Sequence, residues 1–214
     1  MQESLSGNLL AELRQLELQP VSLQIRRRYH EFRSFSLKSE EEWFCELCFC
    51  ILTANSSAQM GMKVQDALGF EGFYRLPERK LSMELQKLGY RFYNKRAHYI
   101  VKARKHLGIK GKLSDFADDR RKRDYLFENV LGLGMKESSH FLRNTGHDNV
   151  AILDRHILAT MHEGGLIPAL PKHLTKKNYL EFESILDHVA QKARMNHSLL
   201  DLYLWYMRTG KVLK

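Results

Sequence analysis

The sequence lacks the features that mark secreted, membrane-spanning and β-rich proteins. No apolar run approaches the ~18 residues of a membrane-spanning helix, and the first residues do not follow a signal-peptide pattern. Sustained alternation of apolar and polar residues, which is typical of β-strands, is also missing. We therefore expect a cytoplasmic protein without a membrane partner, and a nuclear or organellar address stays open.

Cysteine is scarce, and the three cysteines, Cys45, Cys48 and Cys50, crowd into one hydrophobic segment. An odd, clustered set argues against the disulfide framework of a secreted protein. A metal site is the alternative, but no fourth ligand lies nearby, and free cysteine is a common core residue. The ten histidines include no pair with the spacing of an HExxH zinc site. We expect buried cysteines and no metal site.

Helical periodicity dominates the 214 residues, which suffice for one large domain or two small lobes. Leu9, Leu10, Leu13 and Leu16 share one face of a helix predicted over residues 1–18. Ser39, followed three residues later by Glu42, is the sequence signature of a capping box, and the apolar segment after it predicts a buried central helix. The predicted class is all-α.

Positive charge is in excess, with 34 Lys and Arg against 25 Asp and Glu and a net charge of +9. A basic protein suits a polyanionic partner, because each neutralised phosphate releases counterions. The segment Gly89–Arg96 interleaves aromatic and basic residues and leads into a predicted basic helix, Ala97–Leu107. This pattern is typical of nucleic-acid surfaces. An exposed basic helix with two core aromatics explains it equally well.

The stretch Val130–Ile157 organises the chain. It opens with Leu131-Gly132-Leu133-Gly134, a glycine-punctuated hairpin between two predicted helices. Glycines that adopt positive φ let backbone N–H groups approach a phosphate, and the N-terminus of the following helix attracts it further. The alternative is a plain helix–helix turn with glycine caps. Gly132 and Gly134 are therefore candidate DNA-binding residues.

Lys136 and Asp154 add chemistry to this hairpin. Lys136 falls in the first turn of the second helix, where a cation costs roughly 0.3–1 kcal/mol. The helix field, with burial, favours the neutral amine, which is the nucleophile in Schiff-base chemistry. Phosphate binding by an exposed lysine is the competing explanation. Asp154 follows four apolar residues and directly precedes a helix, so it is a candidate N-cap that can also shuttle protons.

At these residues the sequence resembles the helix-hairpin-helix-Gly/Pro-Asp superfamily of DNA glycosylases, in its lysine-bearing, bifunctional members. Ile51–Asn55, Gly89–Ala97 and the C-terminal Asp201–Lys214 resemble the second, largely prokaryotic and archaeal family of 8-oxoguanine DNA glycosylase/AP lyases. The resemblance runs from about Arg27 to the last residue. The hairpin and the loop before Asp154 lack the proline common in the superfamily. No cysteine follows Cys50, so the iron–sulfur cluster of endonuclease III relatives is absent.

The resemblance implies a bifunctional repair enzyme that extrudes 8-oxoguanine from double-stranded DNA. The amine of Lys136 would attack C1′ and displace the base, with Asp154 supporting charge and proton transfer. The resulting Schiff base would allow β-elimination and strand cleavage. No cofactor is implied, and a monomer is expected.

The resemblance also assigns roles around the extruded base. Asn55 would enter the duplex beside the flipped nucleotide, Phe92 and Trp205 would stack on the base, and Asp201 with the terminal Lys214 would read its edge. By residue type alone, Phe92 and Trp205 are more often core residues, and a terminal lysine is usually a surface residue.

Two helical lobes are expected, with the active site in the cleft between them. Residues 34–150 would form a six-helix lobe that holds the wedge and the hairpin, and residues 1–33 and 151–214 a discontinuous second lobe. Two rival functions stay open. The scaffold could act on another damaged base, such as an oxidised pyrimidine, or it could be a non-enzymatic helix-hairpin-helix DNA-binding module.

Overall fold

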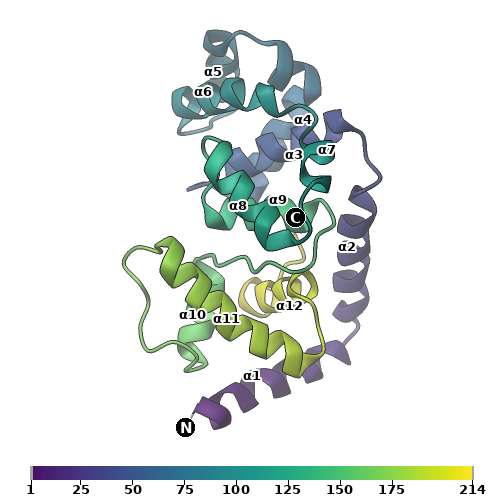
Figure 1. Cartoon of the computed structure of the whole chain (residues 1–214), viewed down its shortest axis with the longest axis vertical. Helices are drawn as coiled ribbons and strands as arrows, with labels where there is room; N and C mark the ends of the chain where they lie inside the picture. Colours follow the sequence, from purple (N-terminus) through teal and green to yellow (C-terminus); the bar gives the residue numbers. More distant parts are fainter. Residues whose placement is uncertain (1, 214) are drawn as a thin grey trace. The chain divides into compact units, whose positions relative to one another are not determined.

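The structure is a computed structural model that describes residues 2–213, with side chains from residue 8 onward. Every regular element in this part of the chain is a helix, which confirms the predicted all-α class (Figure 1). No helix within it is both long and apolar enough to cross a membrane. The chain divides into two compact units. Unit 1 comprises Met1–Arg33 and Gly146–Lys214, and unit 2 comprises Ser34–Thr145.

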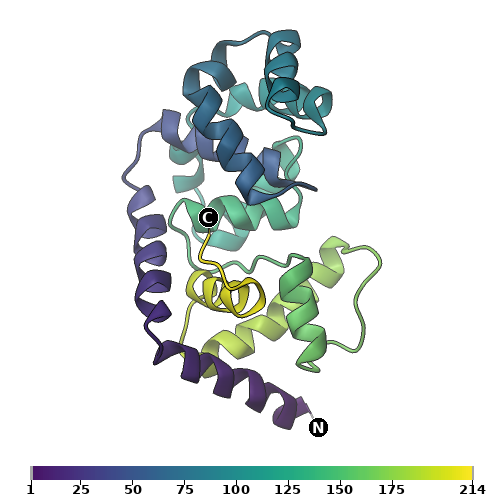
Figure 2. The same ribbon diagram turned by 180° about the vertical axis from the view of Figure 1, so that it is seen from behind.

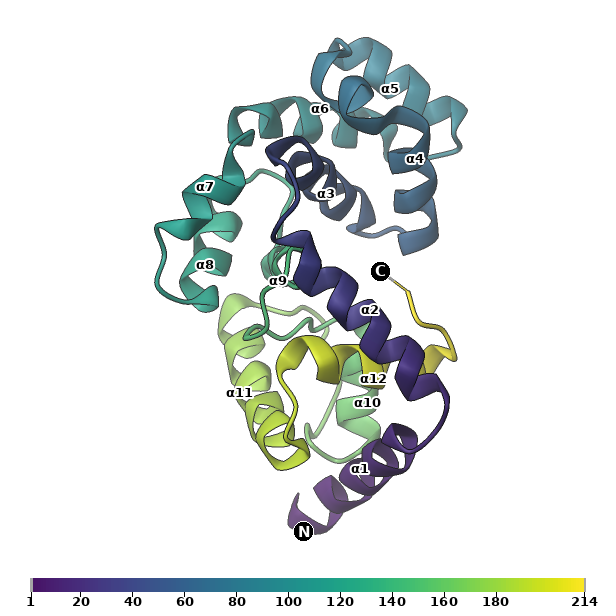
Figure 3. The ribbon, with the colours of Figure 1, turned by 90° about the vertical axis from the view of Figure 1, so that its right-hand side faces the viewer.

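Unit 2 carries the hairpin and is built around one apolar helix. Its elements are α3 (Glu40–Thr53), α4 (Ala58–Arg75), α5 (Glu78–Lys87), α6 (Tyr93–Ala103), the 3₁₀ turn η1 (Arg104–His106), α7 (Ile109–Ser114), α8 (Asp119–Asn129) and α9 (Met135–Asn144). Helix α3 packs against α4, α6, α7 and α9, and α8 packs against α9 (Figure 3). Cys48 and Cys50 are fully buried in α3, as predicted, whereas Cys45 is half-buried. The two buried cysteines pack in the core of the unit.

The predicted capping box begins α3. The Glu42 N–H donates to Ser39 Oγ at 3.2 Å, and the Ser39 N–H donates to Glu42 Oε2 at 2.9 Å. Each bond satisfies a backbone donor that the first helical turn leaves without an intrahelical acceptor. The capping-box signature involves residues only three positions apart, and the structure confirms it at Ser39 and Glu42.

The predicted bounds of the basic helix in unit 2 were wrong. Helix α6 begins at Tyr93, not at Ala97, and ends at Ala103. Helix α4 is interrupted at Gly69, whose φ is +55°. Helix α8 begins at Asp119, because the Asp118 side chain accepts a hydrogen bond from the Arg121 N–H and caps the helix.

Unit 1 carries the residues after the hairpin. Its helices are α1 (Gln2–Glu17), α2 (Val21–Phe35), which crosses the unit boundary, α10 (Arg155–Glu163), α11 (Lys176–Ala193) and α12 (His197–Thr209). Helix α1 packs on α11 and α12, and α12 also packs on α10 and α11 (Figure 2). Leu9, Leu13 and Leu16 are buried, as their shared face predicts, whereas Leu10 is half-buried.

The extended segment before Asp154 lies in the core of unit 1. Val150–Leu153 is buried, and α11 supplies hydrogen bonds that a helix or sheet ladder would otherwise provide. The Ala151 N–H donates to Glu183 Oε1 at 2.9 Å, and the Tyr179 hydroxyl donates to the Ala151 carbonyl at 2.6 Å. These bonds fix the backbone that delivers Asp154 to the start of α10.

Candidate functional site

The hairpin between α8 and α9 uses its two glycines for different reasons. Gly132 has φ +99°, and a Cβ built there would lie 2.5 Å from Tyr99 Cδ2. Backbone conformation and the neighbouring ring therefore both require glycine. Gly134 has φ −85° and ψ −176° and is the N-cap of α9. The expectation of positive φ is thus right for Gly132 and wrong for Gly134, because an N-cap adopts extended backbone.

Lys136 is the second residue of α9, in the first helical turn as predicted. Its Nζ lies 3.2 Å from Glu137 Oε1, and its side chain is 26% exposed. Partial burial limits the amine's conformations and its contact with water. The other end of the lysine side chain is fixed by the helix backbone. The structure therefore presents an amine at the start of a helix, next to a hairpin.

Glu137 is a residue that the sequence analysis missed. Its Oε2 accepts a hydrogen bond from the Gly134 N–H at 3.3 Å while its Oε1 contacts Lys136. A carboxylate in the first turn is also favoured by the helix dipole. The available signal was its position three residues after the N-cap, where capping-box glutamates occur. A glycine N-cap has no side chain to complete the box, which hid the pattern.

The end of α3 presents Asn55 as an exposed residue with φ +58°. This left-handed conformation suits asparagine better than most residues. Two side chains hold the preceding turn: Arg96 Nη2 donates to the Ala54 carbonyl at 2.5 Å, and the Tyr90 hydroxyl donates to the Leu52 carbonyl. Burial is the main cause that raises the pKa of Tyr90 above its ordinary value. Asn55 therefore projects from a firmly held turn.

An aromatic–basic cluster lies at the start of α6, where the sequence interleaves the two residue types. It consists of Arg91, Phe92, Lys95, Arg96 and Tyr99. The Arg91 guanidinium lies 4.4 Å from the Phe92 ring centroid, and Arg96 lies 5.9 Å from Phe92 and 5.5 Å from Tyr99. Arg96 reaches the turn before Asn55, whereas Tyr99 fills the space beside Gly132. The cluster thus joins the predicted wedge to the hairpin within unit 2.

Asp154 caps α10, as predicted. Its Oδ1 accepts hydrogen bonds from the His156 N–H at 2.8 Å and the Ile157 N–H at 2.9 Å. Among the residues that the structure describes, Oδ2 of this half-buried side chain has no hydrogen-bond or ion-pair partner. Capping occupies one oxygen, so it leaves the second for chemistry.

Helix α12 carries Asp201 and Trp205 one turn apart, and both are half-buried. The Trp205 ring meets the edge of His156 at 4.8 Å between centroids, with an interplanar angle of 80°. Since His156 also donates its N–H to Asp154, α10 and α12 place the predicted catalytic carboxylate and the predicted base platform in one unit. The predicted base-reading residue Lys214 lies outside the described residues.

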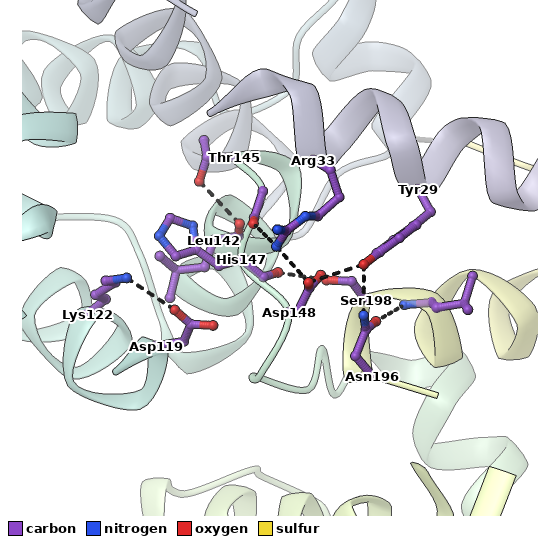
Figure 4. A network of polar contacts seen from close by, with 12 residues as sticks. Tyr29, Arg33, Asp119, Lys122, Leu142, Thr145, His147, Asp148, Asn196 and Ser198 are labelled. Atoms are coloured by element: carbon purple, nitrogen blue, oxygen red, sulfur yellow. Dashed lines mark hydrogen bonds and ion pairs between the residues drawn. The ribbon is translucent and has the colours of Figure 1, made fainter. Parts of the chain in front are cut away.

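A polar network holds the loop that leads toward Asp154 (Figure 4). Asp148 Oδ2 accepts from Arg33 Nη1 at 2.7 Å and from the Tyr29 hydroxyl at 3.2 Å. Asn196 donates to that hydroxyl at 2.9 Å and caps α12 through the Leu199 N–H. Burial is the main cause that raises the pKa of Tyr29. The network fixes the loop against the start of α12. No pattern in the sequence predicted this network.

The predicted site residues fall into two sets. Unit 2 holds Asn55, Phe92, Gly132, Gly134 and Lys136, which the aromatic–basic cluster and the hairpin connect. Unit 1 holds Asp154, Asp201 and Trp205. The pairing of Lys136 with Asp154, the pairing of Phe92 with Trp205 and a cleft between two lobes stay predictions. Gly146 and His147, which the sequence assigned to the hairpin lobe, accept hydrogen bonds at their carbonyls from Arg33 of α2 and Ser198 of α12.

Comparison with known proteins gives one consistent result. A family model described as 8-oxoguanine DNA glycosylase matches residues 25–195. The 8-oxoguanine DNA glycosylase/AP lyase of Methanocaldococcus jannaschii is 48% identical over 205 residues, which cover 96% of this chain and 97% of that protein. The crystal structure of its complex with a 15mer DNA containing 8-oxoguanine superposes with a TM-score of 0.93 at 47% identity, covering 96% of this chain and 99% of that one.

A second solved structure agrees. The 8-oxoguanine DNA glycosylase of Thermotoga maritima superposes with a TM-score of 0.90 at 42% identity and covers 98% of this chain and 100% of that one. The family model spans most of the chain, and these relatives match it over nearly their whole length. The chain therefore belongs to the 8-oxoguanine DNA glycosylase family.

Proposed function

We propose that this protein excises 8-oxoguanine from duplex DNA and then cleaves the strand by β-elimination. The observation that carries the proposal is the position of Lys136, a partly buried amine in the first turn of α9 beside a glycine hairpin, in a member of this family. Relatives that match it over almost their whole length are named as glycosylase and AP lyase. One of them is known in complex with DNA containing 8-oxoguanine.

The chemistry starts with the neutral amine of Lys136. Its lone pair attacks C1′ of the damaged nucleotide, and the bond between C1′ and the base breaks, with the bonding electrons leaving on the base. The attacking nitrogen then loses a proton, and the C1′–O4′ bond of the sugar breaks with its electrons leaving on O4′, which takes up a proton. The product is an iminium between Lys136 and the opened sugar. Loss of a C2′ proton then expels the 3′ phosphate oxygen, which is the β-elimination that breaks the strand.

Asp154 supports this reaction through the oxygen that the helix cap leaves over. Its carboxylate stabilises positive charge that develops on the sugar ring and accepts or returns protons. The two N–H bonds to Oδ1 hold the group in one orientation and leave its second oxygen unused by the helix cap. A carboxylate held by backbone bonds is preorganised, so it needs no rearrangement during the reaction.

The extruded base is recognised by stacking and by its edge. Phe92 and Trp205 stack on the purine, and Asp201 with Lys214 reads the groups that distinguish 8-oxoguanine from guanine. Asn55 enters the space that the base leaves, from a turn whose position Arg96 fixes. Unstacking costs a few kcal/mol, which the new stacking contacts offset.

The DNA backbone binds through the hairpin and the aromatic–basic cluster. Both lie in unit 2, and the net charge of +9 adds attraction for any polyanion. The protein acts on this duplex as a monomer. A cytoplasmic location completes the proposal, and the described helices include none able to span a membrane.

The proposal is tested with duplexes that contain 8-oxoguanine, guanine or an oxidised pyrimidine at one position. Free base and cleaved strand are measured in single turnover for the wild type and for Trp205→Ala. We expect release of 8-oxoguanine in preference to guanine by the wild type, and weaker discrimination by the variant. Equal or greater release of the oxidised pyrimidine would overturn the substrate, and binding without release of any base would leave a DNA-binding module.

A further inference from the structure

Two glutamates in unit 2 stand three residues after a helix N-cap, and each pairs with a lysine in a different geometry. At α3, Glu42 lies 3.0 Å from Lys38, which precedes the N-cap Ser39 and lies outside the helix. At α9, Lys136 pairs with the next residue, Glu137. Successive helical residues do not face each other. Helix geometry alone therefore does not produce the second pair.

Glu137 reaches Lys136 because its carboxylate turns back over the hairpin. Oε2 accepts the Gly134 N–H, which leaves Oε1 beside the amine. A Cβ on Gly134 would lie 3.0 Å from Glu137 Oε2. The φ of Gly134 is one that any residue adopts, so its backbone gives no reason for glycine. The close approach of the Glu137 carboxylate does favour glycine here, because a Cβ would press on that carboxylate.

Burial separates the two pairs further. The side chains of Lys136 and Glu137 are 26% and 13% exposed, whereas those of Lys38 and Glu42 are 51% and 47% exposed. Water screens an exposed pair and makes its geometry loose. A less exposed pair with one partner anchored to backbone holds a narrower range of conformations.

We infer that Glu137 is a positioning residue for the Lys136 amine. The inference rests on the proposed function, in which that amine attacks C1′. A lysine stem has four rotatable carbons, and a small displacement of a reacting atom has a large effect on rate. Glu137 restrains the amine at the hairpin, where the damaged strand binds, and the anchor for this restraint is the Gly134 N–H.

A purely structural cap is the alternative, and Glu137→Gln separates the two. Glutamine is as suitable as glutamate at this capping position, so it keeps an oxygen for the Gly134 N–H, but it has no charge to hold Lys136. Glu42→Gln makes the same change at α3 and is the matched control. Gly134→Ala leaves Glu137 in place and displaces its carboxylate.

Each variant is measured in three ways: single-turnover release of 8-oxoguanine, the dissociation constant for the duplex, and borohydride trapping on a duplex with a preformed abasic site. Thermal unfolding is recorded alongside. For Glu137→Gln we expect release and trapping to slow about 10- to 100-fold, with DNA binding unchanged or tighter and a thermal shift no larger than that of Glu42→Gln. Gly134→Ala should slow trapping less, and Glu42→Gln should retain the wild-type rate.

Wild-type trapping rates in Glu137→Gln would overturn the inference. So would a loss that matches the unfolded fraction or that Glu42→Gln shares. If Glu137→Gln does not fold, an unchanged trapping rate in folded Gly134→Ala overturns it instead. Trapping on abasic DNA does not need base excision, so a wild type that traps but releases no 8-oxoguanine contradicts the proposed substrate alone.

Discussion

The Tyr99 ring occupies the position that a side chain on Gly132 would need, at 2.5 Å from the Cβ that any other residue would place there. The hairpin tip and helix α6 are therefore fitted to each other. Gly132 also has φ +99°, so its backbone conformation and the neighbouring Tyr99 ring each require glycine independently.

Gly132→Ala should lower the free energy of unfolding by about 1–3 kcal/mol from backbone strain, and displacement of Tyr99 should add to this. Denaturant unfolding measures the loss, and duplex binding should weaken with it because the hairpin shifts. In the double variant with Tyr99→Ala the steric part disappears, so the combined loss should be smaller than the sum of the two single losses. Additive losses would contradict the fitted contact.

Replacing Asn55 should leave the fold intact but slow excision of the base. Asn55→Gly keeps a backbone that accepts φ +58°, whereas Asn55→Ala should lose about 1 kcal/mol of unfolding free energy. Both variants lack the wedge side chain, so both should slow single-turnover excision by a similar factor. Excision at the wild-type rate in Asn55→Gly would remove Asn55 from the site.

Asp154→Asn should separate the role of this residue as the N-cap of α10 from its proposed catalytic role. Asparagine caps helices as well as aspartate does, so α10 should keep its start and thermal stability should change little. The charge is lost, so single-turnover strand cleavage should slow by about 10²-fold or more. A variant that cleaves normally would reduce Asp154 to a structural residue, whereas a strongly destabilised one would show that the amide does not reproduce the two cap bonds.

Glu42 makes the stability of the fold depend on pH in the acidic range. Its hydrogen bond from the Ser39 N–H, helped by Lys38, lowers the pKa of Glu42 below its ordinary 4.5. The unfolded chain therefore binds this proton more readily, and the stabilisation is present above pH 4.5 and lost as the pH falls through the folded value. Thermal unfolding from neutral pH to about pH 3 should show a smaller decline for Glu42→Gln than for the wild type. Parallel curves would contradict the assignment.

Local signals in the sequence predicted what local contacts determine. Ser39 with Glu42, Lys136 in a first helical turn and Asp154 as an N-cap all depend on residues within a few positions, and the structure confirms their placement. These positions needed only helix periodicity and capping chemistry.

Contacts between distant residues left no such pattern. Arg96 bonds the Ala54 carbonyl 42 residues away, and Arg33 pairs with Asp148 across 115 residues. Tertiary packing sets these features, and hydrophobic patterns do not encode them individually.

The central claim is that the Lys136 amine becomes covalently attached to the sugar. Borohydride reduction during reaction with a duplex containing 8-oxoguanine, followed by protease digestion and mass spectrometry, locates that bond. The account predicts a protein–DNA adduct on the peptide that contains Lys136 and none with Lys136→Ala. An adduct that survives in Lys136→Ala, an attachment at another residue, or an active wild type that forms no adduct would contradict it.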